Sequence, residues 1–387
     1  MSTPLLTRLY SPYEIGVSGT FLAAASILGT VATFRFENLI PAAEGRAVTW
    51  LIHCALVSTA ITTSFAVLAF WIVSGFDMLN AFLFGLTVLG LAGVSLLMQI
   101  AARRKNLKGI PTAKALQGAG QTGIQLASGI SAITSLGMQL GIAAGYILSV
   151  TAQMLFLRRA DTFEPEKPGW NRRPRKRQLF RQASVLVVAA LINICTVWMY
   201  PLLTQAYFGV EVTGQLTVAQ RIGLAPAALI VASLSPVVIS RMSELIREGH
   251  SVGLEFKRWL IRLSPLGCLA FIAMLVVPKN WLEFVLGGDW SLSRDYLSAM
   301  GLMVAAQVVI GPFGLLLVLQ GRSRHQLLWD ASRLVGLLAV TSATAALSRN
   351  PVAMIWAASI VLTLFYCAYA VIVLRGGGEQ RTSPSAV

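Results

Sequence analysis

The chain has little charge for its length. Only 12% of its 387 residues are Asp, Glu, Lys or Arg, whereas soluble globular domains carry roughly 25%. Hydrophobic residues make up 56% of the sequence, and they occur in continuous runs long enough to cross a bilayer, for which about 20 apolar residues are needed. These features exclude an ordinary soluble enzyme and predict an all-α polytopic membrane protein.

Residues that carry metal or redox chemistry are also scarce. The three histidines are scattered, and each of the four cysteines stands alone inside an apolar run, without the close spacing of a zinc or redox motif. The P-loop pattern GxxxxGK[ST] does not occur in the sequence, which argues against direct ATP drive. We therefore expect no metal site and no cofactor, and we do not expect an enzyme.

Long apolar runs predict about 11 transmembrane helices. The predicted crossings are 17–35, 49–73, 80–101, 113–134, 136–157, 182–206, 213–238, 259–278, 295–319, 326–347 and 351–374. Alternate loops differ sharply in basic charge: one side holds 25 Lys and Arg residues and the other holds four. Because short cytoplasmic loops retain positive charge, the C-terminus is predicted to be cytoplasmic and the N-terminus to lie outside.

A basic polar stretch, 158–181, divides the chain after the fifth predicted crossing. We predict that this stretch is a cytoplasmic linker between an N-terminal helical lobe, 1–157, and a C-terminal helical lobe, 182–387. Basic residues beside a membrane are attracted to anionic lipid, so we expect the lipid bilayer as their partner and no nucleic acid. A short repeat supports two lobes, because YSPYEIG (Tyr10 to Gly16) and YFGVEVTG (Tyr207 to Gly214) each precede a long apolar run.

Four stretches carry a family resemblance. They are LTRLYSPYEIG (Leu6 to Gly16), ATFRFENLIPAAEG (Ala32 to Gly45), YFGVEVTGQLTVAQRIGLAP (Tyr207 to Pro226) and FVLGGDW (Phe284 to Trp290). In this order they resemble the bacterial O-antigen and polysaccharide flippases of the multidrug, oligosaccharidyl-lipid and polysaccharide exporter superfamily.

The resemblance implies two pseudo-repeated helical bundles around a central cavity in the bacterial cytoplasmic (inner) membrane. The implied function is movement of a polyprenyl-diphosphate-linked saccharide from the inner to the outer leaflet for surface polysaccharide synthesis such as O-antigen and lipopolysaccharide, with H+ or Na+ as coupling ion. Members usually have one more helix before the first stretch, so the N-terminal lobe is expected to lack its first helix. We expect a monomer, because the GxxxG glycines of the crossing at 136–157 favour packing within the lobe.

Charged residues within or beside the crossings are the first candidates for binding the substrate diphosphate, because a guanidinium matches phosphate geometry. Arg221 lies about 12 Å into its predicted crossing at 1.5 Å per residue, with no acidic residue in that crossing. Arg333 follows Asp330 by three residues, so the two share a helical face and form either a structural pair or part of the cavity. Arg35 either extends to the interface or acts with Glu37 at the inner cavity mouth.

Three glutamines complete the candidate site. Gln117, Gln121 and Gln125 recur every four residues and therefore share one face of the crossing at 113–134, which is expected to face protein or a wet cavity rather than lipid.

Two other functions compete with the flippase. A cation-coupled drug exporter of the same superfamily needs carboxylates within the membrane, for which only Asp330 and Glu37 qualify. A membrane polysaccharide polymerase or acyltransferase favours a large outer loop, whereas the longest outer loop here runs only from Lys279 to Arg294.

Overall fold

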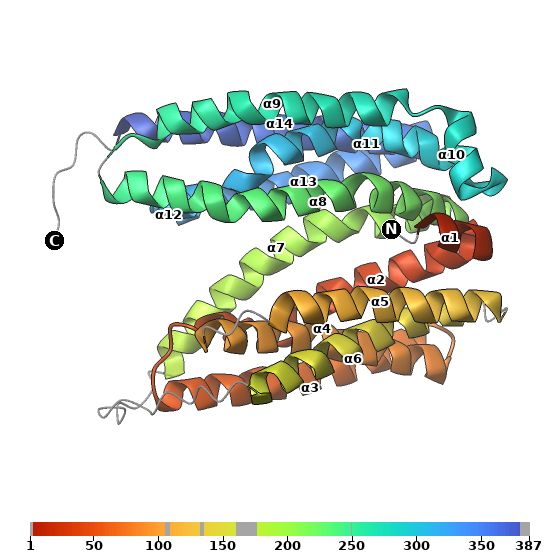
Figure 1. Cartoon of the computed structure of the whole chain (residues 1–387), viewed down its shortest axis with the longest axis horizontal. Coiled ribbons are helices and arrows are strands. Elements are labelled where there is room, and N and C mark those ends of the chain that lie inside the picture. Colours follow the sequence, from red (N-terminus) through yellow and green to blue (C-terminus); the bar gives the residue numbers. More distant parts are fainter. Residues whose placement is uncertain (1–2, 105–108, 132–134, 160–175, 249, 380–387) are drawn as a thin grey trace. The chain divides into compact units, whose positions relative to one another are not determined.

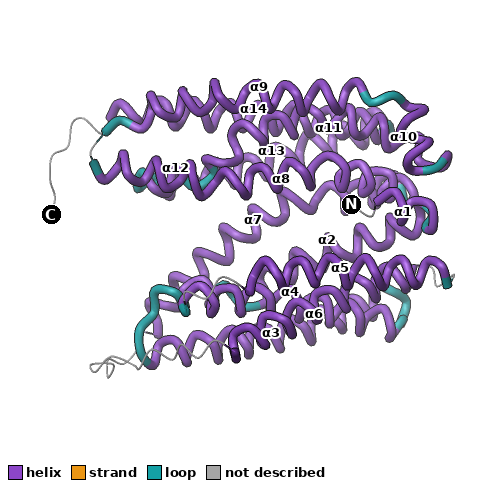
Figure 2. Tube along the Cα trace, in the orientation of Figure 1, coloured by secondary structure: helices purple, strands orange, loops and turns teal. Residues whose placement is uncertain are grey.

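The computed structural model describes residues 3–104, 109–131, 135–159, 176–248 and 250–379, and the regular elements in these ranges are all helices (Figures 1 and 2). Ten of the described helices are long and apolar enough to cross a membrane, which confirms the predicted all-α polytopic fold. The remaining predicted crossing, 113–134, is the helix α5 (Gly109–Ile130), which is less apolar because it carries the three glutamines.

The chain divides into two compact units, Met1–Leu202 and Leu203–Val387. The division lies inside α7 (Lys176–Phe208), one residue after Pro201, whose ring removes a helical hydrogen bond. The N-terminal part of α7 belongs to the first unit, where Ala183 is fully buried in a cluster with Phe36 and Leu51. The predicted linker, 158–181, lies mostly outside the described residues.

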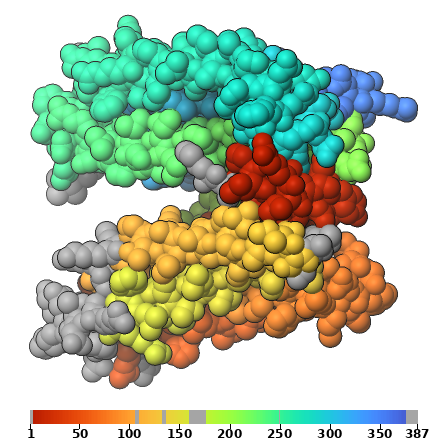
Figure 3. Space-filling view, turned by 45° about the vertical axis from the view of Figure 1, so that its right-hand side comes forward, coloured from red at the N-terminus to blue at the C-terminus, as the bar shows by residue number. Residues whose placement is uncertain are grey.

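Besides that part of α7, the described residues of the first unit form six α-helices and one 3-10 helix. These are α1 (Thr3–Leu9), α2 (Pro12–Ala32), η1 (Phe36–Leu39), α3 (Arg46–Val73), α4 (Met78–Arg103), α5 and α6 (Ser135–Arg159). Three aromatic rings pack together in its core. Phe21 meets Phe70 and Phe84 edge-to-face, and Phe70 stacks on Phe84. In Figure 3, α5 and α6 lie side by side on the surface of this unit.

The second unit begins with a helix much longer than a bilayer needs. Its elements are α8 (Val210–Arg247), α9 (Val252–Val276), α10 (Lys279–Leu286), η2 (Gly288–Trp290), α11 (Ser291–Ile310), η3 (Gly311–Phe313), α12 (Leu316–Leu319), α13 (Ser323–Ser348) and α14 (Pro351–Glu379). The crossing predicted as 295–319 is interrupted at η3, which contains Pro312. Phe256, Phe313, Trp329 and Tyr369 share one hydrophobic core.

The two units repeat the same packing pattern. In the first, α4 contacts α2, α3 and α6, and α5 packs on α6; in the second, α11 contacts α8, α9 and α14, and α13 packs on α14. The helices α2 and α8 therefore hold equivalent places, as the Tyr10 and Tyr207 repeats predict. Both repeats lie at helix starts: Ser11 and Glu14 form a capping box at the start of α2, and Gly209, with φ of 91°, precedes α8.

Apolar side chains also cover much of the outside of the units. On α3 the exposed large residues include Leu56, Ile61, Phe65 and Ile72. Exposed apolar faces of this extent mark contact with a membrane or a partner, and on a helix of 28 residues they are expected to face lipid.

Candidate functional site

Arg221 is a charged residue within a candidate membrane span. It lies on α8 eleven residues after Val210, or about 17 Å along the helix at 1.5 Å per residue. Its side chain is half-buried, and it makes no hydrogen bond or ion pair with any residue in the described ranges. A charge inside a membrane costs about 2.5–3.5 kcal/mol even on insertion scales, and an intramembrane ionisable residue indicates a functional site by default.

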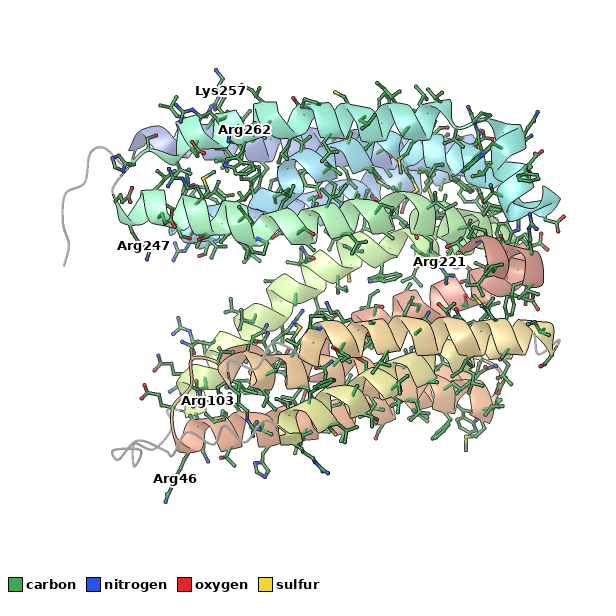
Figure 4. All side chains as sticks on the ribbon, in the orientation of Figure 1. Arg46, Arg103, Arg221, Arg247, Lys257 and Arg262 are labelled. Carbon is green, nitrogen blue, oxygen red and sulfur yellow. The ribbon has the colours of Figure 1, made fainter. Side chains whose placement is uncertain are left out.

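Arg221 lies on the face of α8 opposite its packed face. A Cβ atom on Gly223 would meet the side chains of Met274 on α9 and Leu297 on α11, so Gly223 faces these two helices. Two residues correspond to about 200° around a helix, which turns Arg221 away from α9, as Figure 4 shows. The residues that follow on the Arg221 face are small and exposed: Ala225, Ala228 and Ala232. The Arg221 face of α8 therefore continues in small side chains rather than bulky ones.

Asp330 and Arg333 form an ion pair within α13. Arg333 Nη2 lies 3.1 Å from Asp330 Oδ1, and the two side chains are only 8% and 12% exposed. Gln326 Nε2 donates to Asp330 Oδ2 at 3.0 Å, and the Arg333 guanidinium lies 4.5 Å from the centre of the Trp329 ring. The expected contact between Asp330 and Arg333 is therefore present: both Asp330 oxygens have partners, whereas Arg333 Nε is buried without a hydrogen bond in the described part of the chain.

Arg35 and Glu37 lie in the turn between α2 and α3. Arg35 Nη1 is 3.6 Å from Glu37 Oε1; the Arg35 side chain is 22% exposed and the Glu37 side chain 1% exposed. Burial raises the pKa of the Glu37 carboxyl, and the nearby Arg35 charge opposes this only in part. The turn thus holds a fully buried carboxyl beside a cation that solvent can reach.

The glutamine face of α5 packs against α6. Gln125 is buried, and its Nε2 donates to the Met138 carbonyl of α6 at 3.1 Å. A Cβ atom on Gly141 would lie 2.5 Å from Gln125 Cγ and 2.9 Å from the Gln121 carbonyl oxygen, so the GxxxG glycines pack α6 against α5, as predicted. Gln121 and Gln117 lie half-buried along the same contact.

One polar cluster was not identified from the sequence. Gln215 Oε1 accepts hydrogen bonds from Ser293 N at 3.1 Å and Ser293 Oγ at 2.8 Å, while Gln215 Nε2 donates to the Asp289 carbonyl. These contacts join the YFGVEVTGQ and FVLGGDW stretches across more than 70 residues of chain. The only signal in the sequence was that both stretches contribute to the family resemblance.

Basic side chains gather at one end of each unit. In Figure 4, Arg46 and Arg103 lie at one end of the first unit, and Arg247, Lys257 and Arg262 lie at one end of the second. This is the segregation on which the predicted cytoplasmic side rests, and the orientation itself stays a prediction.

A family model described as "Polysaccharide biosynthesis protein" matches residues 5–295. The chain belongs to this family. The matched region contains the four stretches that predicted a polysaccharide flippase relationship, and the predicted family is confirmed. No curated protein matches the sequence.

Solved structures show how this polysaccharide biosynthesis protein folds. It is similar to an inward-facing multidrug resistance MATE family transporter of the MOP superfamily, with a TM-score of 0.67 and 13% identity over 100% of this chain and 97% of that chain. It is also similar to the lipid II flippase MurJ in an inward closed conformation, with a TM-score of 0.68 and 11% identity over 96% and 86% of the two chains. The protein is therefore a multi-pass integral membrane protein with the fold of MOP-superfamily transporters.

Proposed function

We propose that the protein moves a polyprenyl-diphosphate-linked saccharide from the inner to the outer leaflet of the bacterial cytoplasmic membrane. Membership of the polysaccharide biosynthesis family supports the saccharide part of this substrate. The fold supports transport, because both a MATE transporter and the lipid II flippase MurJ have it. We further propose that the protein works as a monomer and that H+ or Na+ drives it.

The free guanidinium of Arg221 carries the proposal. Arginine binds phosphate oxygens through two parallel N–H···O bonds, and its planar fork suits diphosphate better than a lysine ammonium does. Arg221 has no partner among the described residues and lies on an exposed face of small residues. A diphosphate bound there would supply the missing negative charge and compensate the cost of placing an arginine in the membrane.

The alternative, a cation-coupled drug exporter, shares the same fold. It needs an intramembrane carboxylate that is free to bind a cation. Asp330, the main intramembrane candidate from the sequence, is engaged on one oxygen by Arg333 and on the other by Gln326. This pairing argues against Asp330 as the site of a coupling cation and leaves Glu37 as the other carboxylate that the exporter could use.

The test is the substitution Arg221→Gln in a strain that depends on this protein for surface polysaccharide. A hydrogen bond to a charged group contributes about 1.5–3 kcal/mol, so the rate of flipping of a labelled lipid-linked oligosaccharide in proteoliposomes is expected to fall roughly 10- to 150-fold. Arg241→Gln is the matched control, because Arg241 lies on the same helix in an exposed ion pair with Glu244.

We expect Arg241→Gln to flip at the wild-type rate and Arg221→Lys to fall between wild type and Arg221→Gln. Quantification of each variant in the membrane separates a loss of transport from a loss of protein. Normal surface polysaccharide and an unchanged flipping rate with Arg221→Gln would refute the diphosphate-binding role of Arg221.

A further inference from the structure

The turn between α2 and α3 contains a cluster of buried polar atoms that lack hydrogen bonds. Thr33 Oγ1, Arg35 Nε and both carboxylate oxygens of Glu37 are buried without a hydrogen-bond partner in the described part of the chain. Buried polar atoms in proteins are nearly always hydrogen-bonded, and exceptions require an explanation such as a functional role. Four such atoms within five residues of one turn make this the least satisfied polar cluster of the first unit.

The backbone of the same turn is strained. Phe34 and Arg35 are consecutive non-glycine residues with φ of 50° and 56°, in the left-handed region that costs energy for side chains with a Cβ atom. Strain of this kind persists only where the surrounding structure fixes it, and it is concentrated at binding sites and switches.

Neighbouring helices hold the turn in place from outside. Arg103 of α4 donates to the Ile40 carbonyl at 3.0 Å and also to the Ala43 carbonyl. The Phe34 ring stacks on Phe180 of α7, with 5.3 Å between ring centres. The backbone is therefore fixed on both sides, whereas Arg35 Nε and the two carboxylate oxygens of Glu37 have no hydrogen bond in the described part of the chain.

Arg35 is the charged group that faces the Glu37 carboxylate. The packed helices carry further titratable groups: Arg46, His53 and Cys54 on α3, Arg103 on α4 and Arg104 directly after it, and Lys176, Arg177 and Arg181 on α7. Arg103 bonds to backbone carbonyls and the Lys176 ammonium lies 6.0 Å from the centre of the Trp50 ring, and among the charges of the described residues it is that of Arg35 that acts on the Glu37 carboxyl. A metal cation at Glu37 would be repelled by the Arg35 guanidinium. A proton neutralises the carboxylate without that repulsion, so the geometry favours a proton.

We propose that Arg35 and Glu37 form a proton-controlled phosphate-binding site in the first unit. When Glu37 is ionised, it holds Arg35 in the ion pair. When Glu37 takes up a proton from water, the pair is lost and the partly exposed guanidinium is free to bind a phosphate group. The ligand class, a prenyl diphosphate, rests on the proposed function, whereas the proton switch rests on the geometry of the turn alone.

Ligand binding and proton uptake must be thermodynamically linked at this site. Binding of a phosphate to Arg35 removes the positive partner of Glu37, so each bound ligand must be accompanied by uptake of one proton wherever Glu37 is ionised in the free protein. Because linkage is reciprocal, the affinity must rise as the pH falls, by about tenfold per pH unit above the pKa of Glu37. Below that pKa the affinity becomes independent of Glu37.

Titration calorimetry on the purified full-length protein in an uncharged detergent tests this linkage, with farnesyl diphosphate as the probe. The same titration in two buffers of different protonation enthalpy gives the number of protons taken up. We expect about one proton per ligand at the Arg35 site for the wild type. Glu37→Gln should bind at every pH with only the proton exchange of the ligand itself, and Arg35→Gln should lose this binding.

A second titration distinguishes two sources of phosphate. Short-chain phosphatidylglycerol replaces farnesyl diphosphate under the same conditions. If more protons are taken up per ligand with farnesyl diphosphate, the site is assigned to the lipid carrier. If more are taken up with phosphatidylglycerol, the site is assigned to a membrane headgroup. Absence of Glu37-dependent proton uptake with both probes overturns the proposal.

The Arg221→Gln variant separates this proposal from the proposed function. If the Arg35 site exists, Arg221→Gln should still take up a proton when it binds farnesyl diphosphate. This result does not depend on transport. Transport by Arg221→Gln at the wild-type rate would refute the role of Arg221 and leave the Arg35 site untouched. Infrared spectroscopy gives a ligand-free check: a carboxylic acid C=O band should appear on acidification of the wild type and be missing from Glu37→Gln. If the two proteins give identical infrared titrations, Glu37 does not bind the proton and the proposal fails.

Discussion

Removing one partner of the Asp330–Arg333 pair should destabilise the protein more than removing both. The two charged groups are 3.1 Å apart, and their side chains are about nine-tenths buried. At an effective dielectric constant of about 20, their attraction is of the order of 5 kcal/mol before the cost of removing both charges from water. A buried charge that loses its partner typically costs about 3–5 kcal/mol, whereas replacing the whole pair by neutral groups is often nearly neutral.

The experiment is a double-mutant cycle with Asp330→Asn, Arg333→Gln and the double variant. Stability is measured as the free energy of unfolding in mixed micelles, followed by tryptophan fluorescence. We expect each single substitution to cost about 3–5 kcal/mol and the double substitution to cost less than either single one, which requires a coupling energy of more than about 3 kcal/mol. Trp329, which lies 4.5 Å from the guanidinium, adds to the cost of Arg333→Gln through the lost cation–π contact.

Transport by the double variant then decides between the two roles of the pair. A stable double variant that flips the substrate normally shows that the pair serves the fold, and a stable one that does not flip shows that it binds the substrate. If the two single costs simply add, the groups are not coupled and the reasoning from their contact is refuted.

Two further outcomes follow from charge placement and helix packing. In a protein without native cysteines, a cysteine at Gly209 should react with an impermeant thiol reagent from outside the cell and one at Ser323 should not; labelling of Ser323 in sealed cells would reverse the orientation. Gly141→Ala should lower the free energy of unfolding by about 1–3 kcal/mol through overpacking, because its Cβ would lie 2.5 Å from Gln125 Cγ, whereas Gly118→Ala, which has no neighbour within 4 Å, should not.

Local patterns in the sequence were sufficient to predict the long helices and the contact between Asp330 and Arg333. A crossing helix needs a long apolar run, and such runs are unambiguous in a chain with so few charges. The Asp330–Arg333 contact follows from a spacing of three residues on a helix. The break at η3 was missed because Pro312 interrupts a run that stays apolar on both sides, and apolarity carries no information about a break in the backbone.

Contacts between distant segments could not be predicted in the same way. The spacing of Gln117, Gln121 and Gln125 correctly indicates one polar face of α5, but it does not show which element covers that face. The structure places α6 there, where the stripe of small residues at Gly137, Gly141 and Gly145 leaves room for the glutamines. The hydrogen bonds from Ser293 to Gln215 likewise depend on how α8 and α11 approach each other, which no local pattern encodes.

The charged candidate residues differ most in how many hydrogen bonds and ion pairs they make within the protein itself. Asp330 and Arg333 have each other, Gln326 and Trp329, so a ligand that bound there would have to displace existing contacts. Arg221 has no described partner to displace, and Arg35 has only a long ion pair with a carboxyl that burial makes easier to protonate. Binding energy is gained where the free protein leaves a charge incompletely paired. By this criterion Arg221 and Arg35 are the two residues that we propose for binding a diphosphate.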